Sequence, residues 1–268
     1  MSKYSEYFGF KGEPFSNDIP AKHLLQLPDM VGVKERMDYI INLGGIMVVT
    51  GDVGAGKSTA LRWGVSHYHP SETVVLEIIA NGGTINELYK QLCWAMDLDI
   101  KSASRAYLVK SFRAALQDLV KAKKQRVILI LDEASLLRAE IFAELHTISQ
   151  FDGDSKNLIS IVLAGQAMLL DKLTYRSSAP LASRVLAKTH LSAISLDQMR
   201  EYISHHLKIA GVKKMLFSDT AVTAIQQGSG GLLRKANFLA KGGLVAAAIE
   251  HADLVTAEHI RIAATELI

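Results

Sequence analysis

Short runs of consecutive apolar residues alternate along the first two thirds of the chain with longer segments of helical periodicity. Such runs are typical of strands buried on both faces, and apolar residues at i, i+3 and i+4 are typical of the helices that cover them. Strands are predicted at 46–50, 74–79, 127–131, 158–164 and 185–189. Helices are predicted between them at 57–68, 84–96, 104–123 and 138–151. This alternation predicts a doubly wound α/β fold with a five-stranded parallel sheet.

Only helical periodicity continues after about residue 192. Helices are predicted there at 196–210, 218–227, 232–250 and 256–267. Residue types that cap helix ends lie beside these segments. The expected caps are Ser195, Ser218, Thr256, Gly211 and Gly228. The sequence therefore predicts an α/β domain at 1–191, followed by a small all-helical domain at 192–268.

The loop after the first strand contains the motif G-x-x-x-x-G-K-[ST]. The residues of this glycine-rich loop are Gly51, Asp52, Val53, Gly54, Ala55, Gly56, Lys57, Ser58 and Thr59. Glycines let the backbone turn so tightly that successive N–H groups converge on a phosphate at the positive end of the next helix. Lys57 would add a charge near the β and γ oxygens, and Ser58 would coordinate Mg²⁺. The motif predicts a nucleotide site; the alternative is a surface turn that precedes Lys-Ser by chance.

An acidic pair, Asp132 and Glu133, directly follows the strand at 127–131. Charge is costly at the end of a strand buried on both faces, yet this is the edge where α/β folds bind ligands. We expect Asp132 to hold Mg²⁺ through water, and Glu133 to orient or deprotonate the attacking water. The alternative is an acidic turn that caps the next helix.

Three further polar positions extend this constellation. Gln166 follows the fourth strand and could sense the γ-phosphate or hold the lytic water; an ordinary polar residue is the alternative. Arg184 lies beyond that strand, where an arginine could reach the nucleotide of a neighbouring subunit. Arg176 is a second candidate, and either arginine could instead be solvated. Arg234 opens a helix, where its charge opposes the helix dipole, so a contact elsewhere is expected.

Composition narrows the class of protein. The 268 residues are 49% hydrophobic and 21% charged, as in globular proteins, and their net charge of +3 permits an anionic partner without requiring one. The single cysteine, Cys93, cannot form an internal disulfide. The first residues lack the apolar stretch of a signal peptide, and the longest apolar runs are too short to span a bilayer. We therefore expect a cytoplasmic protein without a membrane segment.

These residues together resemble an AAA+ ATPase of the ExeA-like family, over nearly the whole chain. The resemblance is carried by Tyr7-Phe8-Gly9-Phe10, Glu13-Pro14-Phe15, the glycine-rich loop, Leu131-Asp132-Glu133-Ala134, Leu163-Ala164-Gly165-Gln166 and residues 230–234. It implies that Arg184 is the arginine finger, Arg234 the sensor-2 residue and Gln166 the sensor-1 residue. It also implies that residues 10–15 border the adenine site. Gln166 stands where many AAA+ proteins have Asn or Thr.

Within this family the chain is similar to small transposition ATPases of the MuB and TniB type. Secretion members carry a membrane span and a cell-wall-binding region after the ATPase, whereas this chain ends at Ile268. The resemblance implies an ATP-dependent homo-oligomer, as a ring or a filament, that binds double-stranded DNA without strong sequence preference and directs a transposase. The alternatives are a secretion or cell-envelope assembly ATPase with a membrane partner, and a scaffold that uses the nucleotide as a switch.

Basic residues cluster at 101–113, 121–126 and 208–214. Stacked subunits would multiply weak phosphate contacts from such clusters into salt-sensitive DNA binding. Other conspicuous residues are expected to be structural. Trp63, Trp94 and Cys93 are predicted in the core, and His205 and His206 lack the spacing of a metal site.

Overall fold

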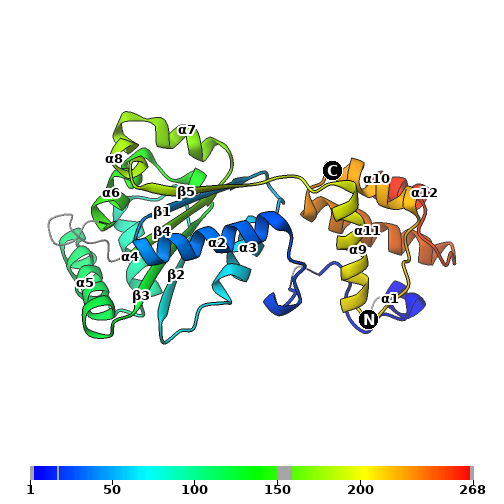
Figure 1. Cartoon of the computed structure of the whole chain (residues 1–268), viewed down its shortest axis with the longest axis horizontal. Helices are drawn as coiled ribbons and strands as arrows, with labels where there is room; N and C mark the ends of the chain where they lie inside the picture. The colour runs from blue at the N-terminus through cyan, green and yellow to red at the C-terminus, as the bar shows by residue number, and fades with distance from the viewer. Residues whose placement is uncertain (1–2, 17, 150–158, 266–268) are drawn as a thin grey trace. The chain divides into compact units, whose positions relative to one another are not determined.

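The computed structural model describes residues 3–16, 18–149 and 159–265, which form two compact units. The sheet unit comprises Pro28–Gly51 and Lys57–Leu191. The helical unit comprises Met1–Leu27, Asp52–Gly56 and Ser192–Ile268. The helical unit therefore combines both ends of the chain, drawn in blue and in yellow to red in Figure 1.

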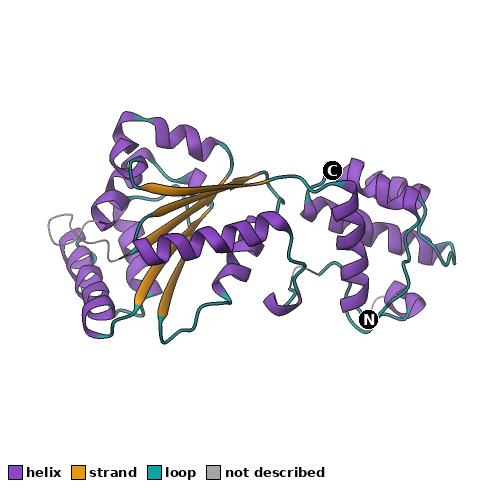
Figure 2. Cartoon of the chain, viewed as in Figure 1, coloured by secondary structure: helices purple, strands orange, loops and turns teal. Residues whose placement is uncertain are grey.

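A parallel sheet of five strands lies at the centre of the sheet unit (Figure 2). The strands are β1 (Ile46–Gly51), β2 (Thr73–Ile79), β3 (Arg126–Asp132), β4 (Ser160–Gly165) and β5 (Val185–Leu191). They pair in the order β2-β3-β4-β1-β5, with every pair parallel. The predicted strands and the α/β fold class are confirmed. Residue 158, where the fourth strand was expected to begin, lies outside the described residues.

Helices cover both faces of this sheet. They are α2 (Pro28–Leu43), α3 (Lys57–Val65), α4 (Ile85–Ala95), α5 (Arg105–Gln117), α6 (Ala139–Ser149), α7 (Met168–Thr174) and α8 (Ala179–Ala182), with the short helical segments η2 (Asp118–Ala122), η3 (Ala134–Leu136) and η4 (Arg176–Ser178). Along β1, Ile46 and Val48 join the core that contains α4, α5 and α6, and the intervening Met47 is buried on the other face. This two-sided burial explains why the strands read as continuous apolar runs.

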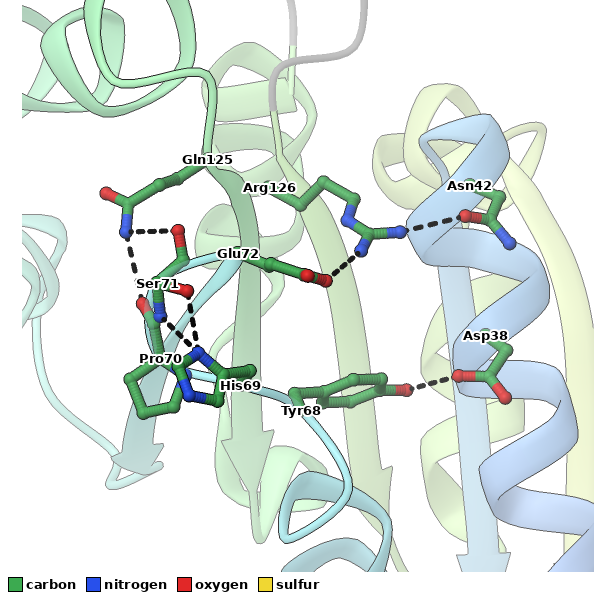
Figure 3. A network of polar contacts seen from close by, with 9 residues as sticks. All are labelled: Asp38, Asn42, Tyr68, His69, Pro70, Ser71, Glu72, Gln125 and Arg126. Atoms are coloured by element: carbon green, nitrogen blue, oxygen red, sulfur yellow. Dashed lines mark hydrogen bonds and ion pairs between the residues drawn. The ribbon is translucent and has the colours of Figure 1, made fainter.

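A polar network holds the edge of the sheet at which β2 and β3 begin (Figure 3). Arg126, the first residue of β3, donates to Asn42 Oδ1 of α2 at 3.1 Å and to Glu72 Oε2 at 3.3 Å. The Tyr68 hydroxyl donates to Asp38 Oδ1 at 3.0 Å. Burial and the neighbouring Asp38 carboxylate raise the pKa of Tyr68. The helix predicted at 57–68 ends at 65, and this network binds the segment that follows it.

The helical unit contains α1 (Lys3–Phe8), η1 (Ala21–His23), α9 (Leu196–Ile209), α10 (Asp219–Ser229), α11 (Leu233–Ile249) and α12 (Ala257–Thr265). Ser195 and Ser218 cap α9 and α10 through their hydroxyls, as predicted. The C-terminal cap of α10 is Gly230, at φ +61°, because the helix continues past the predicted Gly228. No helix among the described residues combines the length and the hydropathy that crossing a bilayer requires.

The N-terminal segment packs in the helical unit, whereas the sequence placed it in the α/β domain. Tyr4, Phe10 and Phe15 are at most 5% exposed, and they share one apolar core with residues of α9 to α12. The backbone N–H of Lys11 donates to the Ala210 carbonyl at 2.8 Å. Burying three aromatic rings among these helices removes much apolar surface from water, which explains where the segment packs.

One assignment of a core residue was wrong. Trp94, predicted in the core, is 62% exposed near the end of α4, whereas Cys93 and Trp63 are buried. Successive helical residues point about 100° apart, so a helix that buries Cys93 turns the next side chain away.

Candidate active site

The order of the strands brings three sequence motifs to one edge of the sheet. β3, β4 and β1 are neighbours, and each ends in one of the motifs. Asp132 ends β3, Gln166 follows β4, and the glycine-rich loop begins with Gly51 at the end of β1. Because the strands are parallel, these ends share the edge at which open α/β sheets bind ligands.

Two glycines determine the path of the loop. Gly54 and Gly56 have φ of +87° and +97°, in the left-handed region that favours glycine. The Ala55 N–H donates to the Asp52 carbonyl at 3.1 Å and closes a tight turn. Asp52 and Val53 are exposed, and Thr59 is half-buried on α3.

The same loop lies against the first turn of α11. The Arg234 N–H donates to the Gly54 carbonyl at 3.1 Å. A Cβ at Gly54 would come within 2.9 Å of Arg234 Cβ, and a Cβ at Gly56 within 3.2 Å of Leu233 Cδ1. The absence of side chains at both glycines therefore allows this approach, which places Arg234 beside the loop.

Lys57 begins α3 and is only 6% exposed. Its Nζ donates to the Gly51 carbonyl at 2.9 Å, so the ammonium is folded back over the loop. The first N–H groups of a helix have no partner within it, and the helix dipole favours an anion at this end. The start of α3 therefore suits a phosphate.

Ser58 and Asp132 meet although they are far apart in sequence. Ser58 Oγ donates to Asp132 Oδ2 at 2.5 Å, and Asp132 Oδ1 accepts from the Glu133 N–H at 2.8 Å. A hydroxyl and a carboxylate in contact form a hard oxygen donor pair of the kind that Mg²⁺ prefers. The described residues contain no group of three or more His, Cys, Asp or Glu that could hold a metal. This pair fits a nucleotide-associated Mg²⁺, which takes few protein ligands and completes its shell with phosphates and water.

Glu133 has an unusual backbone conformation. Its φ of 55° and ψ of 31° are left-handed, a state that costs a non-glycine residue about 1–3 kcal/mol. Asp132 and Glu133 are followed directly by the short helical segment η3, and we call residues 132–137 the acidic turn. Such strain persists only where surrounding contacts enforce it, and it is concentrated at functional sites.

Gln166 joins the acidic turn through its backbone. Its N–H donates to Ser135 Oγ at 3.5 Å. A Cβ at the preceding Gly165 would come within 2.9 Å of the Ser135 backbone nitrogen, so the turn packs tightly against the end of β4. Lys172 of α7 also contacts the turn. Ser135 and Lys172 belong to no sequence motif, so neither was predicted at the site.

The two candidate finger arginines both lie in the sheet unit. Arg184 directly precedes β5 and is half-buried, with its Nε donating to His146 Nδ1 of α6 at 3.2 Å. Arg176 begins η4 and is exposed.

A cavity of about 320 Å³ opens in the helical unit beside Arg234. It is lined by Glu13, Phe15, Ser16, Asp18, Arg234, Asn237, Phe238 and Lys241. Lys241 Nζ lies 2.7 Å from Glu13 Oε1, and the Tyr4 hydroxyl donates to the same oxygen. Burial alone would raise the pKa of Glu13, but these two hydrogen bonds lower it below its ordinary value. The N-terminal segment thus forms one wall of a polar cavity, and α11 forms another.

Comparison with known proteins finds one family model that matches part of the chain and one curated protein that is similar along nearly the whole chain. Residues 41–173 match a family model described as an AAA domain. General secretion pathway protein A of Aeromonas hydrophila is 28% identical over 266 residues, which are 98% of this chain and 48% of that protein. The chain therefore spans about half the length of the curated relative that it matches.

Solved structures share the fold. The Aeropyrum pernix ORC2 protein, in ADPNP-ADP complexes, superposes with a TM-score of 0.73 at 18% sequence identity. The match covers 96% of this chain and 72% of the ORC2 chain. The Aeropyrum pernix ORC1 protein, in complex with DNA, has a TM-score of 0.69 at 16% identity and covers 100% of this chain and 71% of its own. At such identities the likeness shows a shared fold and no more.

Proposed function

We propose that this protein, an ATPase with the AAA+ fold of P-loop NTPases, uses Mg²⁺-ATP to assemble on double-stranded DNA and to direct or regulate a transposase. The match to the AAA domain and the shared fold support ATPase activity and nucleotide binding. Mg²⁺, the DNA, the assembly and the transposase belong to our proposal.

The contact between Ser58 and Asp132 carries the chemical part of the proposal. Backbone N–H groups of the glycine-rich loop and of α3 would bind the phosphates, and Lys57 would exchange its bond to Gly51 for a phosphate oxygen. Mg²⁺ held by Ser58 and Asp132 would neutralise charge on the phosphate oxygens.

Glu133 would accept a proton from the water that attacks the γ-phosphorus. The bond from that phosphorus to the β–γ bridging oxygen breaks, which yields ADP and phosphate. Gln166, joined to the acidic turn through Ser135, would orient the water.

The remaining site residues would act from outside the sheet edge. We propose that Arg184 of a neighbouring copy stabilises the developing charge, which would couple hydrolysis to assembly. Arg234 would act as the sensor-2 residue and residues 10–15 would border the adenine, as the resemblance to AAA+ ATPases implies.

The lysines at 208–214 are the best candidates for DNA contact. Lys208, Lys213 and Lys214 are exposed and have no ion-pair partner among the described residues. The other two clusters are partly neutralised, because Arg105 pairs with Glu144 at 2.6 Å and Lys123 with Asp118 at 3.3 Å. The Aeropyrum pernix ORC1 protein, which shares this fold, was solved in complex with DNA, so the fold is compatible with a DNA partner.

ATP hydrolysis and electron microscopy with and without duplex DNA test this function. We expect DNA to change the turnover rate and ATP to produce rings or filaments on DNA. The double variant Lys213→Glu/Lys214→Glu should weaken DNA binding and its dependence on salt. Lys123→Glu/Lys124→Glu, an equal change of charge at a cluster already paired with Asp118, is the comparison and should weaken it less.

A second candidate function is an ATPase of secretion or cell-envelope assembly that acts on a membrane partner. The 28% identity to General secretion pathway protein A along nearly the whole chain favours it. Turnover and particles that are indifferent to DNA would support this candidate against the transposition ATPase.

A further inference from the structure

Lys172 bridges two backbone carbonyls of the acidic turn. It lies on α7 and is half-buried, and its Nζ donates to the Ser135 carbonyl at 2.6 Å and to the Leu137 carbonyl at 2.7 Å. Both carbonyls lie within four residues of Glu133. A charged donor makes stronger hydrogen bonds to carbonyls than a neutral one does.

The acidic turn needs such a partner because its own hydrogen bonds are few. The Leu136 N–H donates to the Glu133 carbonyl at 2.9 Å, and the Leu137 N–H to the Ala134 carbonyl at 3.2 Å. The last carbonyls of so short a turn have no later N–H within it to accept from. Lys172 supplies donors to two of them while Glu133 remains in its left-handed conformation.

Ser135 is also held from the side of β4. Its hydroxyl accepts from the Gln166 N–H, and Gly165 leaves room for its backbone. Because α7 begins two residues after Gln166, the two contacts fasten the acidic turn to one continuous segment, 165–172.

We infer that Lys172 is a positioning residue for ATP hydrolysis: its two hydrogen bonds hold the acidic turn, and with it Glu133, in place against the end of β4. This inference rests on the proposed roles of Glu133 and Gln166. Lys172 acts through backbone carbonyls of the turn and has no part in binding the phosphates, which the glycine-rich loop receives. Its loss therefore affects the chemical step and leaves nucleotide affinity unchanged.

Lys172→Met and Lys172→Arg test the inference. Lys172→Met keeps the apolar stem and removes every donor, and we expect kcat to fall about 100-fold while the Kd for ATP stays within about twofold. Lys172→Arg restores donors and should recover kcat to within about tenfold of the wild type. Lys188→Met, at an exposed position on β5, is the matched control and should leave both constants unchanged. Unchanged kcat in Lys172→Met, or an equal loss of affinity, would overturn the inference.

A double-variant cycle with Glu133→Gln separates positioning from general stability. If Lys172 acts through Glu133, adding Lys172→Met to Glu133→Gln causes little further loss in single-turnover hydrolysis, whereas multiplied losses contradict the inference. Should Lys172→Met not fold, Lys172→Leu also removes every donor, and a folded Lys172→Leu variant with wild-type kcat would then refute the role. A wild-type protein without ATPase activity would refute the proposed chemistry itself, whereas hydrolysis that needs Glu133 but not Lys172 would refute only this inference.

Discussion

Ser58 Oγ and Asp132 Oδ2 lie 2.5 Å apart, so one hydrogen bond joins the start of α3 to the end of β3. Ser58 and Asp132 would hold a cation in place of this hydrogen bond, Ser58 through its hydroxyl oxygen and Asp132 through water. We therefore expect Ser58→Ala to raise the Mg²⁺ concentration for half-maximal hydrolysis about 10- to 100-fold, a cost typical of altered metal sites. Measuring the hydrolysis rate at increasing Mg²⁺ concentrations gives this half-maximal concentration. Ser66→Ala, which removes a hydroxyl bonded to the Trp63 carbonyl, is the control, and an equal effect of both would contradict the metal site.

Glu133→Gln should uncouple hydrolysis from binding. The amide is nearly isosteric but cannot accept a proton, so we expect turnover to fall about 10²- to 10⁴-fold while ATP affinity is retained. Single-turnover hydrolysis and binding of a fluorescent ATP analogue measure the two effects. Glu140→Gln, at an exposed position in the first turn of α6, should change neither. A wild-type rate no higher than that of Glu133→Gln would favour a scaffold that uses the nucleotide as a switch.

Gly165→Ala should destabilise the sheet unit. The new Cβ would come within 2.9 Å of the Ser135 backbone nitrogen, and a backbone atom cannot yield as the end of a side chain can. We expect the free energy of unfolding to fall by about 1–3 kcal/mol, measured by urea denaturation. Gly82→Ala is the matched control, because a Cβ there meets nothing within 4 Å. Equal stability of the two variants would contradict the tight packing of the acidic turn on β4.

His206 should make the stability of the helical unit depend on pH. Burial, and then the charge of His205, lower the pKa of His206 from 6.5 to about 3. Between these pH values the unfolded chain binds a proton that the folded protein excludes, so stability decreases as the pH falls from 6.5 towards 3. The slope contributed by one such group reaches about 1.4 kcal/mol per pH unit.

His206→Phe should remove that contribution, and the new ring can retain the stacking on Phe15. Urea denaturation at pH 7, 6 and 5 compares the slopes of the wild type and the variant. His23→Phe, at an exposed position, should keep the wild-type slope. Parallel slopes for the wild type and His206→Phe would show that folding does not lower the pKa of this histidine.

The strands of the sheet could be predicted because the pattern that identifies a buried strand lies within the strand's own residues. A strand covered on both faces is apolar at every position, as β1 is, and no distant information is needed to recognise it. The glycine-rich loop was recognisable for a similar reason, since Gly54 and Gly56 need positive φ within a few residues of each other. Helix α2 was missed, although Met30, Val33 and Met37 of its buried face recur at helical spacing.

Relationships between distant segments were not predictable. The order β2-β3-β4-β1-β5, which makes Gly51, Asp132 and Gln166 neighbours in space, depends on pairing between strands far apart in the chain. Lys172 has no pattern of its own, because its partners are backbone carbonyls that every residue carries. The burial of Phe10 depends on helices that lie about 190 residues later.

The shared core of Phe10 and Ile260 has a consequence for biosynthesis. During translation, the first aromatic residues leave the ribosome long before the last helices that cover them are synthesised. The sheet unit has all its strands once residue 191 has emerged and can fold while synthesis continues. The helical unit, in contrast, must wait for its C-terminal half, so its N-terminal rings stay solvated in the nascent chain, and chaperones can bind them there.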